Sequence, residues 1–172
     1  MKNLEMDFSG GKNRFLVLDV ETQYLSDEIP GGWNAVEKFK VAVVVTWDEG
    51  NNVRLWFEED VPKLLAELEM FDTIVTYNGE NFDFRVLSAY GSVKSLYQKS
   101  MDMLSILNRK LGFRVSLQAL GKATLGRGKS GSGKESVSWW RSGNKQKVIE
   151  YCTKDVELTR DIYLFGCLSS WN

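Results

Sequence analysis

The sequence predicts an α/β fold, in which helices cover a mixed sheet of parallel and antiparallel strands. Three apolar, strand-like segments with a hairpin signal come first, a helical segment and a fourth strand follow, and the rest of the chain is mostly helical. Three antiparallel strands followed by a crossover to a further strand give a sheet of this mixed kind. A chain of 172 residues has a normal size for one domain, so we expect residues 1–172 to form a single domain.

The strand predictions rest on short apolar runs bounded by turn residues. They cover residues 15–20, 39–47, 53–57 and 73–77. The stretch 48–52 between the second and third runs is rich in Asp, Gly and Asn and is typical of a hairpin turn, so these two strands should pair antiparallel. A loop joins the first two runs, and Pro30-Gly31-Gly32 marks a turn within it.

The helix predictions rest on apolar residues at helical spacing between capping residues. They cover residues 61–70, 84–90, 101–111, 117–125 and 148–168. Asp60 is the candidate N-cap of the first, Gly112 closes the third, and Ser116 caps the fourth. Residues 126–133 are rich in Gly, Lys and Ser and are predicted to be a flexible loop. The last helix is the longest, and its apolar stripe is typical of a helix with one buried face.

Charge is unevenly distributed along the chain. Residues 1–98 hold 9 Lys and Arg against 17 Asp and Glu, a net charge of −8, whereas residues 99–147 hold 11 against 2, a net charge of +9. Residues 148–172 contribute −2, and the whole chain carries −1. A basic block of this size indicates an anionic partner such as nucleic acid. The alternative is a solvated surface helix and loop.

The chain contains no histidine. This composition excludes Ser-His-Asp triads, Cys-His pairs, histidine zinc sites and histidine general bases. Any catalysis must therefore use carboxylates or the side chains of Tyr, Lys, Cys or Ser.

The cysteines and the N-terminus bear on the cellular compartment. Cys152 and Cys167 form no C-x-x-C pair, so neither a zinc site nor a disulfide framework is indicated, and a reducing compartment is expected. Residues 1–10 lack the apolar run of a signal peptide, and no stretch approaches the ~18 apolar residues of a membrane span. We therefore expect a cytoplasmic location and no membrane partner.

A first pair of carboxylates stands at the end of the first predicted strand. Asp19 and Glu21 are two residues apart, and side chains at i and i+2 of a strand share a face, ~7 Å apart along it. Both carboxylates can therefore share one hard cation. The alternative is that the Asp-x-Glu pattern only marks the end of a strand.

A second candidate motif follows the fourth predicted strand. Asp83 ends the segment Asn78-Gly79-Glu80-Asn81-Phe82-Asp83, at a strand-to-helix junction of the kind where α/β proteins place site residues. The alternative is that Asp83 is only the N-cap of the helix predicted at 84–90.

The third candidate motif lies on the last predicted helix. Tyr151 and Asp155 are four residues apart and share a helix face, with Cβ atoms ~5–6 Å apart. Asp155 lies near the apolar stripe, where a carboxylate needs a partner or a metal ion. The alternative is an exposed aspartate beside a tyrosine of the core.

Together, the three motifs resemble those of the DEDD (DnaQ-like) 3′–5′ exonuclease superfamily. They occur in that family's order and on its elements, as Asp19-x-Glu21, Asn78-x-x-x-Phe82-Asp83 and Tyr151-x-x-x-Asp155. The tyrosine is typical of the DEDDy branch, and the lack of histidine agrees with that branch. The resemblance covers roughly residues 14–166. It implies a ribonuclease H-like fold with a mixed five-stranded sheet, three antiparallel strands plus parallel strands, flanked by helices.

The resemblance also implies two-metal hydrolysis of phosphodiester bonds. Two Mg²⁺ or Mn²⁺ ions ~3.5–4 Å apart activate a water and stabilise the attacking and leaving oxygens, and hard oxygen ligands suit these ions. By resemblance, Asp19 would bridge both ions, with Glu21 and Asp155 on the nucleophile side. Asp83 would hold the second ion, directly or through water. Tyr151 would orient or deprotonate the attacking water.

Other residues are expected to support this chemistry. Asn78 and Phe82 belong to the second motif, and Asn78 would support it by hydrogen bonds. Arg127, Lys129 and Lys134 lie in and beside the flexible loop, and we expect them to contact substrate phosphates. A site of four carboxylates repels a phosphate backbone unless positive charge nearby steers it in.

The chain is similar to small ribonuclease H-like exonuclease domains found alone or beside helicases in bacteria and viruses. The expected partners are therefore the 3′ end of DNA or RNA and a helicase or another replication or repair protein. The segment 23–36 departs from the pattern, since many members have a tighter hairpin there, and this bears on substrate geometry more than on chemistry. Two other functions stay open: a non-catalytic nucleic-acid-binding module that kept the fold, and a ribonuclease H-like endonuclease.

Overall fold

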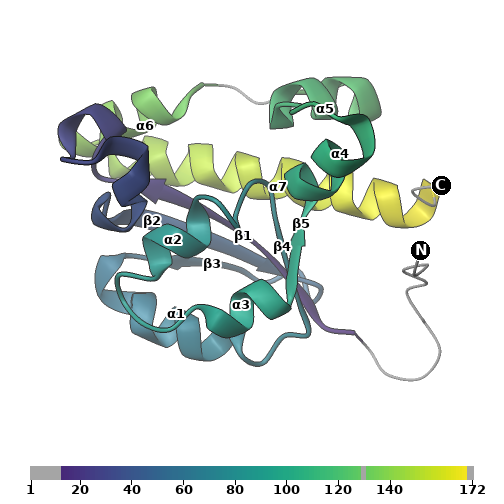
Figure 1. Ribbon diagram of the computed structural model, residues 1–172, viewed down its shortest axis with the longest axis horizontal. Helices are drawn as coiled ribbons and strands as arrows, with labels where there is room; N and C mark the ends of the chain where they lie inside the picture. Colours follow the sequence, from purple (N-terminus) through teal and green to yellow (C-terminus); the bar gives the residue numbers. More distant parts are fainter. Residues whose placement is uncertain (1–12, 129–130, 170–172) are drawn as a thin grey trace.

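The computed structural model describes residues 13–128 and 131–169, which build a five-stranded sheet with helices on both faces (Figure 1). The strands are β1 Phe15–Thr22, β2 Val41–Asp48, β3 Val53–Trp56, β4 Thr73–Thr76 and β5 Ser100–Asp102. They lie in the order β3-β2-β1-β4-β5. β1, β2 and β3 pair antiparallel, whereas β4 runs parallel to β1 and β5 parallel to β4. The predicted mixed five-stranded sheet is therefore confirmed.

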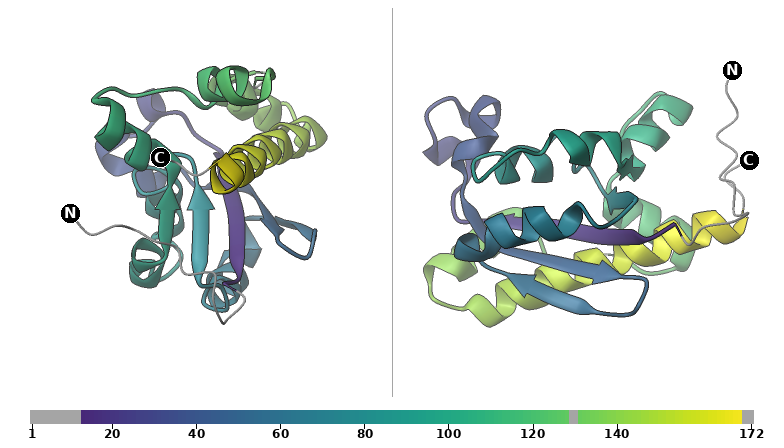
Figure 2. Two further views of the ribbon diagram at one scale, coloured as in Figure 1. Left: turned by 90° about the vertical axis from the view of Figure 1, so that its right-hand side faces the viewer. Right: turned by 90° about the horizontal axis from the view of Figure 1, so that it is seen from below.

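Helices form a layer on each face of the sheet (Figure 2). The α-helices among the described residues are α1 Val61–Leu68, α2 Asp83–Leu87, α3 Lys94–Gln98, α4 Met103–Leu111, α5 Leu117–Leu125, α6 Gly133–Arg141 and α7 Lys145–Ser169. The 3₁₀ helices are η1 Ser26–Glu28, η2 Gly32–Lys38 and η3 Glu58–Asp60. Side chains of α1, α2, α3 and η2 share one core with the sheet, and those of α4, α5 and α7 share the other.

Strand β1 is at the centre of the sheet and contributes to both cores. Leu16 belongs to the core under α1 to α3 and Val17 to the core under α7, and each is at most 1% exposed. Because successive side chains of a strand alternate between its faces, Asp19 and Glu21 share the face of Val17. The alternation therefore directs both carboxylates toward α7.

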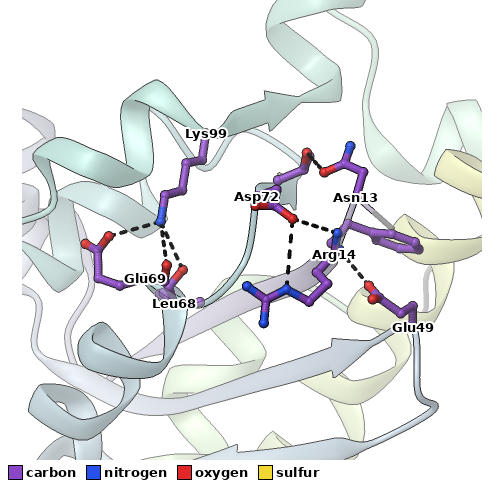
Figure 3. A network of polar contacts seen from close by, with 9 residues as sticks. Asn13, Arg14, Glu49, Leu68, Glu69, Asp72 and Lys99 are labelled. Atoms are coloured by element: carbon purple, nitrogen blue, oxygen red, sulfur yellow. Dashed lines mark hydrogen bonds and ion pairs between the residues drawn. The ribbon is translucent and has the colours of Figure 1, made fainter. Parts of the chain in front are cut away.

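The amino ends of the parallel strands are held by paired charges (Figure 3). The backbone N–H of Arg14 donates to the Asp72 carboxylate at 2.9 Å, and the Arg14 guanidinium lies 4.0 Å from the same group. The Lys99 ammonium lies 3.0 Å from the Glu69 carboxylate and also donates to the Glu69 carbonyl at 3.0 Å. At this end of the sheet, carboxylates lie next to basic side chains.

The helix predicted at 101–111 is wrong at its start. Residues Ser100–Asp102 pair with β4 as strand β5, and α4 begins only at Met103. The Asp102 side chain caps α4, because it accepts hydrogen bonds from the backbone N–H groups of Leu104 and Ser105. An N-cap residue keeps an extended backbone, so Asp102 can end a strand and start a helix.

Other differences concern short helices that the sequence pattern does not reveal. α3 and α6 are not predicted, and 3₁₀ helices occupy much of the expected loop at 23–36. Asp60 occupies the N-cap position of α1, as predicted, but its side chain does not cap that helix, because a 3₁₀ turn precedes it and the Asp60 carboxylate accepts from the backbone N–H of Phe57. The cap at Ser116 is confirmed, since its side chain accepts from the backbone N–H of Ala119 at 3.1 Å. Among the described residues, no helix is both long and apolar enough to cross a membrane.

Candidate metal centre

Three carboxylates from two elements meet where the end of β1 faces α7. Asp19, Glu21 and Asp155 offer carboxylate oxygens that all lie within 4.8 Å of one another. Glu21 and Asp155 are buried, at 7% and 3% exposure, and Asp19 is partly buried. Like charges this close raise the free energy of the folded state unless protons or cations reduce the repulsion. Several oxygen ligands converging on one point suit a hard divalent cation.

Cys152 contributes to holding α7 against β1 at this point. Its Sγ lies 3.3 Å from both the backbone oxygen and a carboxylate oxygen of Asp19. Burial raises the pKa of the Cys152 thiol well above its ordinary value, and the carboxylates of Asp19 and Glu21 raise it further. The thiol therefore stays protonated at neutral pH, and a protonated thiol can donate to Asp19 but is a poor nucleophile.

Asp83 brings a fourth carboxylate to the same region from the start of α2, which covers the opposite face of the sheet from α7. It is the first residue of α2 and Phe82 occupies the N-cap position, so the alternative that Asp83 is only an N-cap is wrong. The carboxylate is 3% exposed, and its Oδ1 has no hydrogen-bond partner among the described residues. Burial raises the pKa of Asp83 well above its ordinary value, the Asp19 carboxylate adds to this effect, and backbone N–H groups at Asp83 and Val20 oppose it. A buried oxygen without a partner fits a metal ligand, since a bound cation would offset the cost of burying it.

Tyr151 lies one helical turn before Asp155 on the same face of α7. Its side chain is 3% exposed and packs edge-on against the Trp139 ring of α6, with ring centroids 5.9 Å apart and planes at 70°. Gly131 approaches the ring closely, since a Cβ at that position would lie 3.2 Å from a Tyr151 ring carbon. Contacts from α6 and the loop before it therefore fix the direction of the Tyr151 ring.

The turn between β4 and α2 is held by Asp102, a residue that the sequence analysis does not single out. Asp102 is 2% exposed and accepts hydrogen bonds from the backbone N–H groups of Asn78 at 2.8 Å and Glu80 at 3.2 Å. Asn78 adopts a positive φ of 70°, and its side-chain oxygen accepts from the Arg114 guanidinium at 3.0 Å. A capping residue before a helical pattern could have marked Asp102 as the start of α4, but not its hydrogen bonds to this turn.

A cavity of about 680 Å³ opens in front of the carboxylates. All five residues predicted to be catalytic line it: Asp19, Glu21, Asp83, Tyr151 and Asp155. The supporting residues Asn78 and Phe82 line it too. The fold therefore brings the three sequence motifs together around one space.

The structure divides the three basic residues that were expected to contact phosphates. Lys134, at the start of α6, lines the cavity. Arg127 does not line it, and its guanidinium instead forms an ion pair with Asp161 of α7. Lys129 lies outside the described residues. Of the two that are described, only Lys134 is placed to meet a ligand in this cavity.

Known proteins share this fold. Residues 16–165 match a family model described as the RNase_H superfamily. Among solved structures, the chain is similar to a family B DNA polymerase from the hyperthermophilic archaeon Pyrobaculum calidifontis, with a TM-score of 0.68 and 14% sequence identity over 91% of this chain and 25% of the polymerase. The chain thus spans about a quarter of that polymerase, and at this identity the likeness shows the fold alone. No curated protein sequence matches the chain.

Proposed function

The chain belongs to the ribonuclease H superfamily, and we propose that it is a metal-dependent 3′–5′ exonuclease of the DEDDy type that hydrolyses DNA or RNA. The observation that carries the proposal is the carboxylate cluster, in which oxygens of Asp19, Glu21 and Asp155 lie within 4.8 Å of one another. Asp83, whose buried Oδ1 has no hydrogen-bond partner among the described residues, lines the same cavity. The order of the motifs and the tyrosine of the third support the exonuclease assignment by resemblance.

The donor set consists of carboxylate oxygens, which suit Mg²⁺ and Mn²⁺ better than softer metals. Asp19, Glu21 and Asp155 would hold one ion, and Asp83 together with Asp19 would hold a second. Two such ions, when bound, supply an activated water and stabilise the charge on the attacking and leaving oxygens. Their positive charge would also reverse the local potential that otherwise repels a phosphate backbone.

Tyr151 is the candidate group for handling the attacking water. The chain has no histidine to act as a base, and the Cys152 thiol is kept protonated by its surroundings. A tyrosine hydroxyl in the cavity wall can orient the water by a hydrogen bond or accept its proton. The contacts of Tyr151 with Trp139 and Gly131 would hold that hydroxyl in one direction.

The proposed partners follow from the same assignment. The substrate would be the 3′ end of a nucleic acid, with Lys134 next to its phosphates. A helicase or another replication or repair protein would supply that end, as the resemblance of the motifs to small exonuclease domains implies.

The direct test uses linear and circular single strands of DNA and RNA, with the linear strands labelled at the 5′ end. With Mn²⁺, the linear strands should shorten stepwise from the 3′ end, circles should survive, and a chelator should stop the reaction. Cleaved circles would favour an endonuclease. Binding without degradation, with Mn²⁺ or with Mg²⁺, would favour a non-catalytic module. Asp19→Ala serves as the control for a contaminating nuclease.

A further inference from the structure

Trp33 is a large aromatic side chain at the cavity that the proposed chemistry does not use. It belongs to η2, within the segment 23–36, and lines the cavity that the carboxylates also line. Its exposure is 66%, whereas Phe39 beside it is 1% exposed. A core residue would be buried like Phe39, so packing alone does not account for Trp33.

The Trp33 ring is supported on the side away from solvent. Its centroid lies 5.7 Å from that of Phe39, with the planes at 58°, and 6.2 Å from that of Phe82, with the planes at 57°. Tilted contacts at these distances are favourable for aromatic rings. Phe82 directly precedes Asp83, so the ring rests on the turn that positions a candidate metal ligand.

Helix α2 also holds the backbone of Trp33. The Arg85 guanidinium donates to the carbonyl oxygens of Trp33 at 3.2 Å and Asn34 at 2.9 Å, and it lies 3.5 Å from the Glu37 carboxylate. Arg85 is two residues after Asp83 on the same helix. Trp33 is therefore fixed relative to Asp83 through both its side chain and its backbone.

The other part of the same segment is joined to α6 across the cavity. The Arg141 guanidinium forms an ion pair with Glu28 and lies over the Tyr24 ring, 6.0 Å from its centroid. The segment thus has anchors on two helices, one from each side of the sheet. An aromatic ring held in this way can bind a flat ligand with little loss of conformational entropy.

We propose that Trp33 is a stacking platform for an unpaired nucleobase near the 3′ end, and that the substrate class is therefore single-stranded nucleic acid. The inference rests on the proposed nuclease function. Stacking on an aromatic side chain tolerates every base, as an exonuclease that removes successive nucleotides requires, and typically strengthens binding about tenfold or more. A base inside a duplex has both faces covered by its neighbours, and the terminal base of a blunt duplex has one face covered and is held by its pairing partner, so unpaired bases are far better able to stack on Trp33.

The test is a double-mutant cycle between Trp33 and the terminal base. Single strands of roughly ten nucleotides, within the range of known binding sites, carry either an ordinary or an abasic nucleotide at the 3′ end. Affinity is measured by fluorescence anisotropy with Ca²⁺, a larger hard cation, in place of Mg²⁺, and KM and kcat are measured with Mn²⁺. Trp33→Phe retains an aromatic ring. Phe165→Ala removes an exposed aromatic side chain of α7, ten residues beyond Asp155 and therefore ~15 Å along the helix.

Trp33→Ala should weaken binding of the ordinary strand and raise its KM, each by about tenfold, with kcat little changed. Trp33→Phe should retain most of the affinity, and Phe165→Ala should match the wild type. The abasic end should weaken binding to the wild type but cause no further loss in Trp33→Ala, because the two changes remove the same contact.

Three results would overturn the platform. Trp33→Ala could lose as much affinity for the abasic strand as for the ordinary strand, Phe165→Ala could lose as much affinity as Trp33→Ala, or the wild type could bind a blunt duplex as tightly as a single strand. If the wild type degrades nothing, the proposed function fails. The anisotropy cycle still decides the role of Trp33 in that case.

Discussion

The carboxylates at the two ends of the parallel strands have different surroundings. At the amino end, Asp72 lies beside Arg14 and Glu69 beside Lys99 (Figure 3). At the carboxyl end, three carboxylates lie within 4.8 Å of one another, and a fourth, Asp83, is buried with a raised pKa. The amino end therefore resembles an ordinary protein surface, whereas the carboxyl end concentrates charge that a bound cation would stabilise.

This difference indicates which end was selected for stability and which for binding. Exposed ion pairs like those of the amino end typically contribute ~0–1 kcal/mol each. A buried carboxylate with an unpartnered oxygen has the opposite effect, because it lowers the stability of the ion-free fold. Substitutions at the two ends should therefore have opposite effects on stability and activity.

The largest expected effect is the loss of activity in Asp19→Ala. Asp19 stands next to the other three carboxylates, and a ligand shared by two ions supports both, so the rate should fall by roughly 10³-fold or more. The measurement is single-turnover cleavage of an end-labelled strand, with circular dichroism to check folding. Turnover near the wild-type rate would rule out Asp19 as a shared ligand.

Tyr151→Phe should slow cleavage by ~10²-fold or more, since a positioned proton transfer contributes ~10²–10⁴-fold. The ring contacts with Trp139 are retained in this variant, so stability and the rise in melting temperature with Mn²⁺ should match the wild type. A full rate across neutral pH would show that Tyr151 is only a packing residue.

Lys134→Ala should raise KM several-fold with little change in kcat. If Lys134 contacts one phosphate, the slope of log K against log salt should flatten by ~0.7 for a single strand. Arg127→Ala is the matched control, because Arg127 is paired with Asp161 and does not line the cavity. A larger change in salt slope for Arg127→Ala than for Lys134→Ala would reverse this assignment.

The smallest effect is expected at the amino end. Asp72→Asn removes an exposed pair whose side chains are about half exposed, so the free energy of unfolding should fall by at most about 1 kcal/mol and the melting temperature by ~2–4 °C. Cleavage should be unchanged. A loss of activity comparable to that of Asp19→Ala would remove the distinction between the two ends.

Local spacing in the sequence was sufficient for strands β1 to β4 and for the candidate site motifs, but not for β5, which was expected to be helical. Strand alternation places Asp19 and Glu21 on one face, and helical spacing aligns Tyr151 with Asp155. Tertiary contacts decided the rest. Asp102 acts through hydrogen bonds to a turn more than twenty residues earlier in the chain, which no local pattern reveals.

The basic residues show the same limit. Lys134 and Arg127 are close in sequence and equal in charge, yet one lines the cavity and the other pairs with Asp161. The sequence did not indicate a role for Trp33 either, since its place at the cavity depends on contacts with Phe82 and Arg85, about fifty residues later in the chain.

The central claim is that the carboxyl end of the sheet is built to bind divalent cations, and Asp83→Asn tests it through thermal unfolding with and without Mn²⁺. The raised pKa of Asp83 means that the folded state holds this proton more tightly than the unfolded state. The stability of the folded state therefore falls as the pH rises above about 4, the ordinary pKa of an aspartate. Without metal at neutral pH, Asp83→Asn should melt higher than the wild type, and the difference should vanish near pH 3. Mn²⁺ should raise the melting temperature of the wild type and raise that of the variant less, because ion binding to the folded state stabilises it. The account would be contradicted if Mn²⁺ left the melting temperature of the wild type unchanged and Asp83→Asn melted lower than the wild type at neutral pH.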